Sequence, residues 1–247
     1  MKFASSLVTA GLMSFGSLTA SAQTLRPNEI RVEAMATGEE RSAQADLWVM
    51  DVYFKPLGLI PVQVTDPATG VKREQFVLYI TYRAFNRPLP QRGAEEALVN
   101  EFDPPVSSPL FVPEFTLVAS DGIEQKVYSD VVVPEALEAI NRREKGQYKS
   151  AVSVVGPVPE IVTRSDRDAA EKGISGVAMF QGVDPDADFY TVYLTGFSNG
   201  IRLAPGPDGT KIVQTKTIVQ KYRRPGDRFD RKEEEYLLDG DSKWIYR

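Results

Sequence analysis

QFVLYITYRA, residues 75–84 of the chain, predicts a β-strand because its side chains alternate between two faces. One face carries Phe76, Leu78, Ile80 and Tyr82, and the other carries Val77, Tyr79, Thr81 and Arg83. Aromatic and β-branched side chains favour strands. We expect this strand to form a meander or hairpin with the segments before it.

The segments before and after residues 75–84 also show the residue patterns of strands and turns. Residues 46–64 hold strand formers interrupted by Pro56, and DPATG at 66–70 is turn chemistry. Residues 115–119 and 124–133 flank a second turn. Five more strands are predicted at 176–180, 189–197, 210–222, 234–238 and 243–246. Many short strands with Gly/Pro turns predict a mainly β fold made of one or two antiparallel β-sandwich domains, immunoglobulin-like in type.

The best helix signal in the chain covers residues 134–145, after the first group of strands. Pro134 suits the first helical position, and Glu135 lies near the positive end of the helix dipole. Leu137 and Ile140 form a short apolar stripe, and Gly146 follows as a cap.

The chain divides at a Pro/Gly-rich stretch. GPVP at 156–159 predicts a linker over residues 150–164, between an N-terminal β domain at 23–149 and a C-terminal β domain at 165–247. A single continuous sandwich is the alternative, and the sequence does not determine the strand order.

Residues 1–22 are predicted to be a secretory signal peptide. Lys2 precedes a short apolar run, and Ala20-Ser21-Ala22 offers a small-x-small cleavage site before Gln23. The run is too short and too rich in Ser, Thr and Gly for a membrane anchor. We therefore expect an exported protein of the periplasm or the extracellular space, with no membrane span after cleavage.

Composition excludes the commonest catalytic groups. The chain has no Cys and no His, so disulfides, thiolate nucleophiles, Ser-His-Asp triads and imidazole metal sites are all impossible. Its net charge is −5, which makes nucleic acid a poor partner. Catalysis would have to use carboxylates, Lys, Tyr, or a hydroxyl activated without imidazole.

Three segments resemble exported, uncharacterised proteins of planctomycete-type bacteria: WVMDVYFKPL at 48–57, FQGVDPDADFYTVYLTGFSNGI at 180–201, and RPGD at 224–227 with WIYR at 244–247. Those proteins have no assigned activity, so the resemblance implies an envelope or secreted protein and assigns no catalytic residue.

The segment DPDAD at 184–188 has ligand-like spacing. Asp184, Asp186 and Asp188 are candidate ligands for Ca²⁺, which takes carboxylate oxygens in loops. Phe189 and Thr195 stand where an EF-hand needs Gly and Glu, so that motif is absent. Because Asp and Pro are also ordinary turn residues, the sequence favours a plain turn, with no cofactor.

The absences favour a non-catalytic interaction or structural protein of the bacterial cell envelope whose partner is another envelope protein. The alternative is a carboxylate-based hydrolase or a carbohydrate-binding β-sandwich protein. Acids in RRPGDRFDRKEEE at 223–235 could serve hydrolysis, and exposed strand aromatics could bind a carbohydrate. A salt-bridged surface and core packing explain the same residues without either activity.

Overall fold

A computed structural model describes residues 28–66, 68–89, 110–121, 123–163, 171–224 and 236–247. The predicted signal peptide, residue 164 of the predicted linker, and residues 225–235 of the acidic and basic segment lie outside the described residues.

The first sheet has β4 at its centre. The strands lie in the order β1 (Ile30–Val32), β2 (Met50–Phe54), β4 (Lys72–Asn86), β10 (Ile174–Gln181) and β8 (Lys149–Ser150). β3 (Gly58–Thr65) also pairs with β4, along its N-terminal half. All pairs are antiparallel except β10 with β8. The strand predicted at 75–84 is confirmed, and its central place explains why both of its faces are buried from Val77 onward.

The second sheet is arranged around β13. Its order is β12 (Ile201–Pro205), β13 (Lys211–Arg223), β11 (Phe189–Thr195), β6 (Glu114–Asp121) and β7 (Glu124–Ser129). β14 (Leu237–Leu238) and β15 (Lys243–Tyr246) also pair with β13. A separate short ladder joins β5 (Leu110–Phe111) to β9 (Gly156–Pro157). The described chain is mainly β, as predicted.

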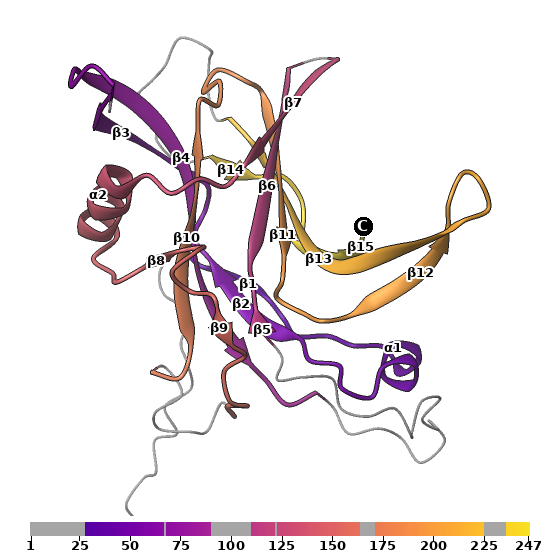
Figure 1. Ribbon diagram of the computed structural model, residues 1–247. Helices are drawn as coiled ribbons and strands as arrows, with labels where there is room; N and C mark the ends of the chain where they lie inside the picture. The colour runs from indigo at the N-terminus through magenta and orange to yellow at the C-terminus, as the bar shows by residue number, and fades with distance from the viewer. Residues whose placement is uncertain (1–27, 67, 90–109, 122, 164–170, 225–235) are drawn as a thin grey trace, which may run out of the picture.

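One apolar core lies between the two sheets (Figure 1). Leu78, Ile80 and Tyr82 of β4 face it from the first sheet, and Leu117 and Val192 face it from the second. At its centre the ring of Phe197 has four aromatic rings at 5.1–6.3 Å: Phe54, Tyr82, Phe111 and Phe115. Burial of these side chains supplies most of the force that holds the sheets together.

The opposite face of the first sheet is covered by α2 (Pro134–Glu144) (Figure 1). Ala136 and Ile140 pack with Val77 and Tyr79 of β4. The predicted helix is confirmed, but its C-cap is Lys145, in the left-handed conformation at φ 50°, rather than Gly146.

Strands from both sides of residues 150–164 alternate within both sheets. β10 pairs with β4 in the first sheet, and β11 pairs with β6 in the second. The predicted linker therefore connects strands of shared sheets. That the chain unfolds as two separate units stays a prediction, which unfolding measurements can test.

Several local features differ from the sequence predictions. α1 (Gly38–Ala43) was not expected; the Thr37 hydroxyl caps the Glu40 amide, and the Glu40 carboxylate caps the Thr37 amide. β12 was also not expected as a separate strand. β7 ends at Ser129 instead of 133, because the chain there crosses the edge of the first sheet and Val131 donates to the Met179 carbonyl at 2.9 Å.

Candidate functional site

The predicted Asp loop joins β10 to β11, and its three acids have separate local roles. The Asp184 carboxylate accepts the Asp186 amide at 2.9 Å, and the Asp186 carboxylate lies 3.6 Å from the Arg224 guanidinium. The backbone carbonyl of Asp188 accepts the Arg224 amide at 3.0 Å. Ala187, between them, is buried in the main core. These contacts are those of a turn anchored to β13.

Across the residues that the structure describes, no group of three or more acids is placed to hold a metal ion. The structure thus brings the three Asp residues into one turn without converging their side chains on a point. The plain turn, rather than a calcium site, at Asp184, Asp186 and Asp188 stays a prediction for solution measurements.

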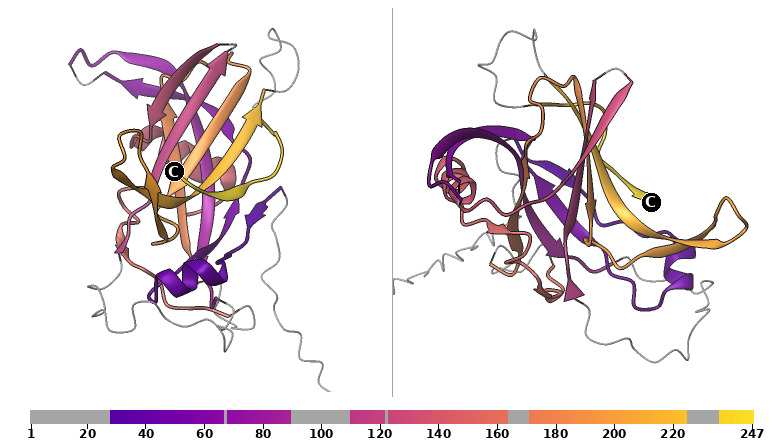
Figure 2. Two further views of the ribbon diagram at one scale, coloured as in Figure 1. Left: turned by 90° about the vertical axis from the view of Figure 1, so that its right-hand side faces the viewer. Right: turned by 45° about the horizontal axis from the view of Figure 1, so that its top comes forward.

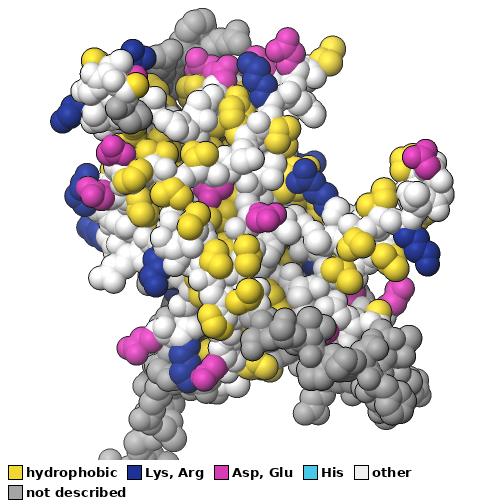
Figure 3. All heavy atoms as spheres, viewed as in Figure 1, with side chains coloured by type: hydrophobic (Ala, Val, Ile, Leu, Met, Phe, Trp, Pro, Cys, Tyr) yellow, Lys and Arg dark blue, Asp and Glu magenta, His cyan; other side chains and the backbone are white. Residues whose placement is uncertain are grey.

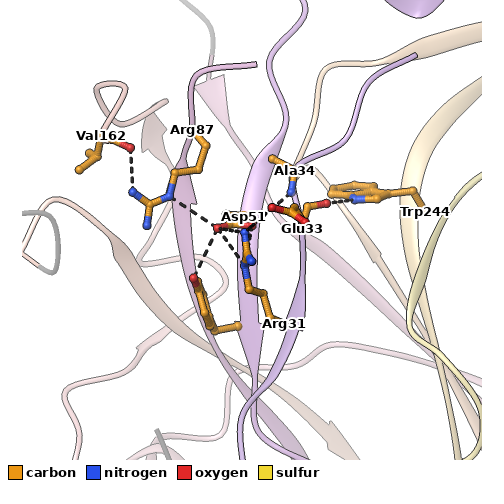
Figure 4. Close-up of polar contacts among 8 residues, drawn as sticks. Arg31, Glu33, Ala34, Asp51, Arg87, Val162 and Trp244 are labelled. Carbon is orange, nitrogen blue, oxygen red and sulfur yellow. Dashed lines mark hydrogen bonds and ion pairs between the residues drawn. The ribbon is translucent and has the colours of Figure 1, made fainter. Parts of the chain in front are cut away.

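A charged cluster that the sequence analysis missed surrounds Asp51 on β2 (Figure 4). The Asp51 side chain is fully buried, and the Arg31 guanidinium of β1 donates to both of its oxygens at 3.0–3.2 Å. The Ala34 amide donates to the same carboxylate at 3.2 Å, and the Tyr53 hydroxyl at 3.4 Å. A buried carboxylate needs such partners, because an unpaired charge is costly away from water.

Arg87, at the end of β4, completes this cluster (Figure 4). Its Nε lies 3.6 Å from the Asp51 carboxylate, and one of its terminal nitrogens donates to the Val162 carbonyl at 2.8 Å. Burial, and next the charge of Asp51, raise the pKa of Tyr53, so the phenol stays protonated and can donate.

A ladder of guanidinium groups and rings continues along the same face. Arg83 forms a two-point ion pair with Glu29 at 2.5–2.9 Å. The Arg83 guanidinium lies 5.3 Å from the centre of the Tyr53 ring and 5.8 Å from that of Phe85, and Arg87 lies 5.1 Å from the Phe85 ring. Acids and bases are matched here, so the arrangement braces β1, β2 and β4.

A second cluster joins α1 to β13 and β15. The Lys216 ammonium donates to the Glu40 carboxylate at 2.6 Å, and the Tyr246 hydroxyl donates to the same oxygen. The rings of Trp244 and Tyr246 each lie 5.8 Å from the ammonium. Burial would raise the pKa of Glu40, but hydrogen bonds from Lys216 and Tyr246 outweigh it and lower that pKa. Burial, and then the bond to Glu40, raise the pKa of Tyr246.

Neither cluster could be found from spacing in the sequence. Asp51 and Arg87 are 36 positions apart, and Glu40 and Lys216 are 176 apart. One signal was available: Asp51 interrupts the apolar run VMDVYF, and an acid inside such a run needs a buried partner.

Apolar side chains are exposed at several strands. Ile201 and Leu203 of β12 and Val213 of β13 lie on a hairpin that projects from the body (Figures 1 and 3). Ile123, beside the β6–β7 turn, is fully exposed, and Val127 of β7 is 66% exposed. Exposed apolar residues that gather in this way are typical of contact surfaces.

An open hollow of about 550 Å³ lies beside the Asp loop. Its apolar wall includes Phe76 of β4, Val131 after β7, and Val183 and Pro185 of the loop. Glu74, Gln75 and Gln181 form its polar rim. Among the described residues, no group of three or more acids placed to hold a metal ion lies at this hollow.

None of the helices in the described part of the chain is long and apolar enough to cross a membrane. Comparison of the chain with protein-family models, with curated proteins and with solved structures finds no match. The resemblance to exported planctomycete-type proteins stays a prediction.

Proposed function

We propose that this chain is a non-catalytic interaction or structural protein of the bacterial cell envelope, built as an immunoglobulin-like β-sandwich. Support for the sandwich comes from the shared core between two antiparallel sheets. Strands from both halves contribute to each sheet, which favours one sandwich over two.

The observation that carries the proposal is a contrast between the inside and the surface of the molecule. The charged side chains around Asp51 and Lys216 are matched to one another, as a brace requires and as a reactive site does not. Meanwhile, aliphatic side chains remain exposed on β7 and on the β12–β13 hairpin. Exposed strands of this kind suit a partner that binds along a sheet.

Export is a separate part of the proposal. It rests on the segment before Gln23 and on the absence of Cys, which lets the chain fold without disulfides in any redox environment. The partner is proposed to be another envelope protein and not nucleic acid, in keeping with the net charge of −5.

Site-specific photocrosslinking in the native host tests the interaction. A photoreactive residue at Val127 or Leu203 should give discrete adducts, whereas one at the exposed polar Lys145, on the opposite side of the first sheet, should give none. Equal and diffuse labelling at all three positions would contradict an interaction role.

Cell fractionation with N-terminal sequencing tests export. A periplasmic or secreted species that begins at Gln23 is expected. A cytoplasmic species that retains Met1 would refute this part of the proposal alone.

A further inference from the structure

The outer edge of β7 carries a complete row of backbone donors and acceptors. Among the described strands only β6 pairs with β7, so β7 ends the second sheet (Figure 2, left). The Asp130 amide donates to the Phe115 carbonyl at 3.1 Å, which sets the phase of the ladder. Bonded and non-bonded pairs alternate in an antiparallel ladder. The backbone groups of Gln125, Val127 and Ser129 therefore point away from β6.

This edge is protected only by the shortness of β7 and by Lys126. None of its three outward-facing residues is Pro, so each keeps its N–H group. At the other edge of the sheet, the strand β12 differs. There the Gly206 amide donates to the Thr210 carbonyl at 2.7 Å, and this bond shows which backbone groups of β12 face β13. The backbone groups of Ile201, Leu203 and Pro205 therefore point away from β13, and Pro205 has no N–H to donate.

From this geometry we infer that two copies of the chain associate through antiparallel pairing of their β7 strands, about a two-fold axis at Val127. In that register Val127 faces Val127 of the second copy, and Gln125 faces Ser129 of the second copy. Every outward donor then meets an outward acceptor. The inference rests on the proposed interaction role and adds a second copy of this chain as the partner at β7.

Side chains on both faces of β7 fit the same register. On the outer face Val127 lies beside Val118 of β6, so self-pairing makes an apolar row of four valines across the junction. On the other face Lys126 falls opposite Tyr128 and diagonal to Asp130 of the second copy. The described residues bring no basic side chain within ion-pair distance of Asp130, whose Oδ1 accepts the Met179 amide at 2.6 Å. A lysine from a second copy complements that acid.

The hairpin tip gives the strongest reason to choose a second copy over an unrelated peptide. The two-fold axis places the fully exposed Ile123 of one copy near the segment after Ser129 in the other copy, which includes Val131. Val131 lines the open hollow with Phe76 and Val183. The protruding apolar group and the hollow that receives it thus both belong to this chain, as an isologous interface requires.

Cysteine crosslinking tests the register directly, because the natural chain has no Cys. Facing Val127 Cα atoms in a hydrogen-bonded pair would lie about 5.5 Å apart, within disulfide range. Val127→Cys in the chain as its host processes it should form a covalent dimer under mild oxidation. Leu203→Cys is the matched control, exposed to a similar degree on the other edge strand, and should stay monomeric.

Molar mass measured by light scattering on a sizing column provides the second test. The unmodified chain should have twice the monomer mass, and Val127→Pro should return it to monomer, because proline removes an outward N–H without breaking a bond to β6. Leu203→Pro should leave the dimer intact. Circular dichroism and melting establish that each variant folds.

Two results would overturn the dimer. One is a monomer at every concentration together with no Val127→Cys crosslink; the other is a dimer that Val127→Pro leaves unchanged. If adducts with another protein still form at Val127 in the host, the interaction role survives and an extended segment of that protein replaces the second copy. If neither adduct nor dimer forms at Val127 or Leu203, both proposals fail.

Discussion

The carboxylate of Glu40 lies 2.6 Å from the ammonium group of Lys216, although 176 residues separate them in the chain. Glu40 belongs to α1, a helix with no buried residue, and Lys216 is 4% exposed on β13. Because α1 brings no apolar side chain into a core, polar contacts attach it to the second sheet: this ion pair, and the bonds of its C-cap residue Gln44 to Asn199 and Ile201.

Glu40→Gln should destabilise the fold by about 2–3 kcal/mol, because it leaves the buried Lys216 ammonium without its counter-charge. Thermal or urea unfolding at neutral pH measures the loss. Glu39→Gln, one position earlier and exposed, is the control and should change stability by less than about 0.5 kcal/mol. Equal effects of the two substitutions would show that the ion pair contributes nothing.

The same pair predicts a loss of stability in acid. The pKa of Glu40 is lowered in the folded chain from its ordinary 4.5. A lowered carboxyl pKa stabilises the fold above the ordinary value, and that contribution disappears as the pH falls through the folded value. The difference in stability between the natural chain and Glu40→Gln should therefore shrink below about pH 4.5; a difference constant with pH would contradict this.

The stability contributed by Asp130 should change with pH in the opposite direction to that of Glu40. Burial raises the pKa of Asp130 from 3.8 to about 6, and the bond from the Met179 amide only partly offsets it. The folded state thus favours the protonated acid, and the associated stability is lost as the pH rises through about 6. Asp130→Asn should raise stability at pH 7.5 by about 1–2 kcal/mol and leave it unchanged near pH 4.

The Asp130→Asn comparison should be made in a chain that also carries Val127→Pro, because the proposed dimer would otherwise bring Lys126 of a second copy close to Asp130. If Asp130→Asn has the same effect at both pH values, the carboxylate does not titrate in this range.

Calcium should leave the melting temperature unchanged. The Asp186 carboxylate is already placed near Arg224, and the Asp184 carboxylate already caps the turn. Melting in excess EDTA and then in millimolar Ca²⁺ compares the two states. An ion at a hundredfold excess over its Kd would stabilise by about 2.7 kcal/mol. A rise of several degrees that Asp186→Ala removes would establish the calcium site instead.

Phe197→Ala should destabilise both halves of the chain together. Its ring contacts aromatic rings from both sheets, and truncating a buried Phe costs about 3–5 kcal/mol. Near- and far-ultraviolet circular dichroism should report one transition, shifted equally, while Met35→Ala, at an exposed position away from β7, should shift nothing. Two separate transitions, or proteolysis that leaves two resistant fragments cut at residues 150–163, would support two folded units.

Local chemistry in the sequence was sufficient for the individual elements. Alternation predicted the strand at 75–84, and Pro134 with the charge gradient predicted the helix that follows β7, because periodicity and helix caps act within a few residues. Asp and Pro also indicated a turn at Asp184 to Asp188, and the hydrogen bond between neighbours there is of that local kind, while the absence of calcium stays a prediction.

Only the tertiary structure determined which strands are neighbours. Backbone hydrogen bonds are alike for every strand, so pairing depends on side chains that meet across long separations, such as Tyr82 and Phe197. The sequence alone therefore suggested two units divided at 150–164, where the sheets interleave both halves. The Asp51 and Lys216 clusters could not be predicted for the same reason. A buried charge can be suspected from the apolar residues beside it in the sequence, but the packing of distant strands determines its partner.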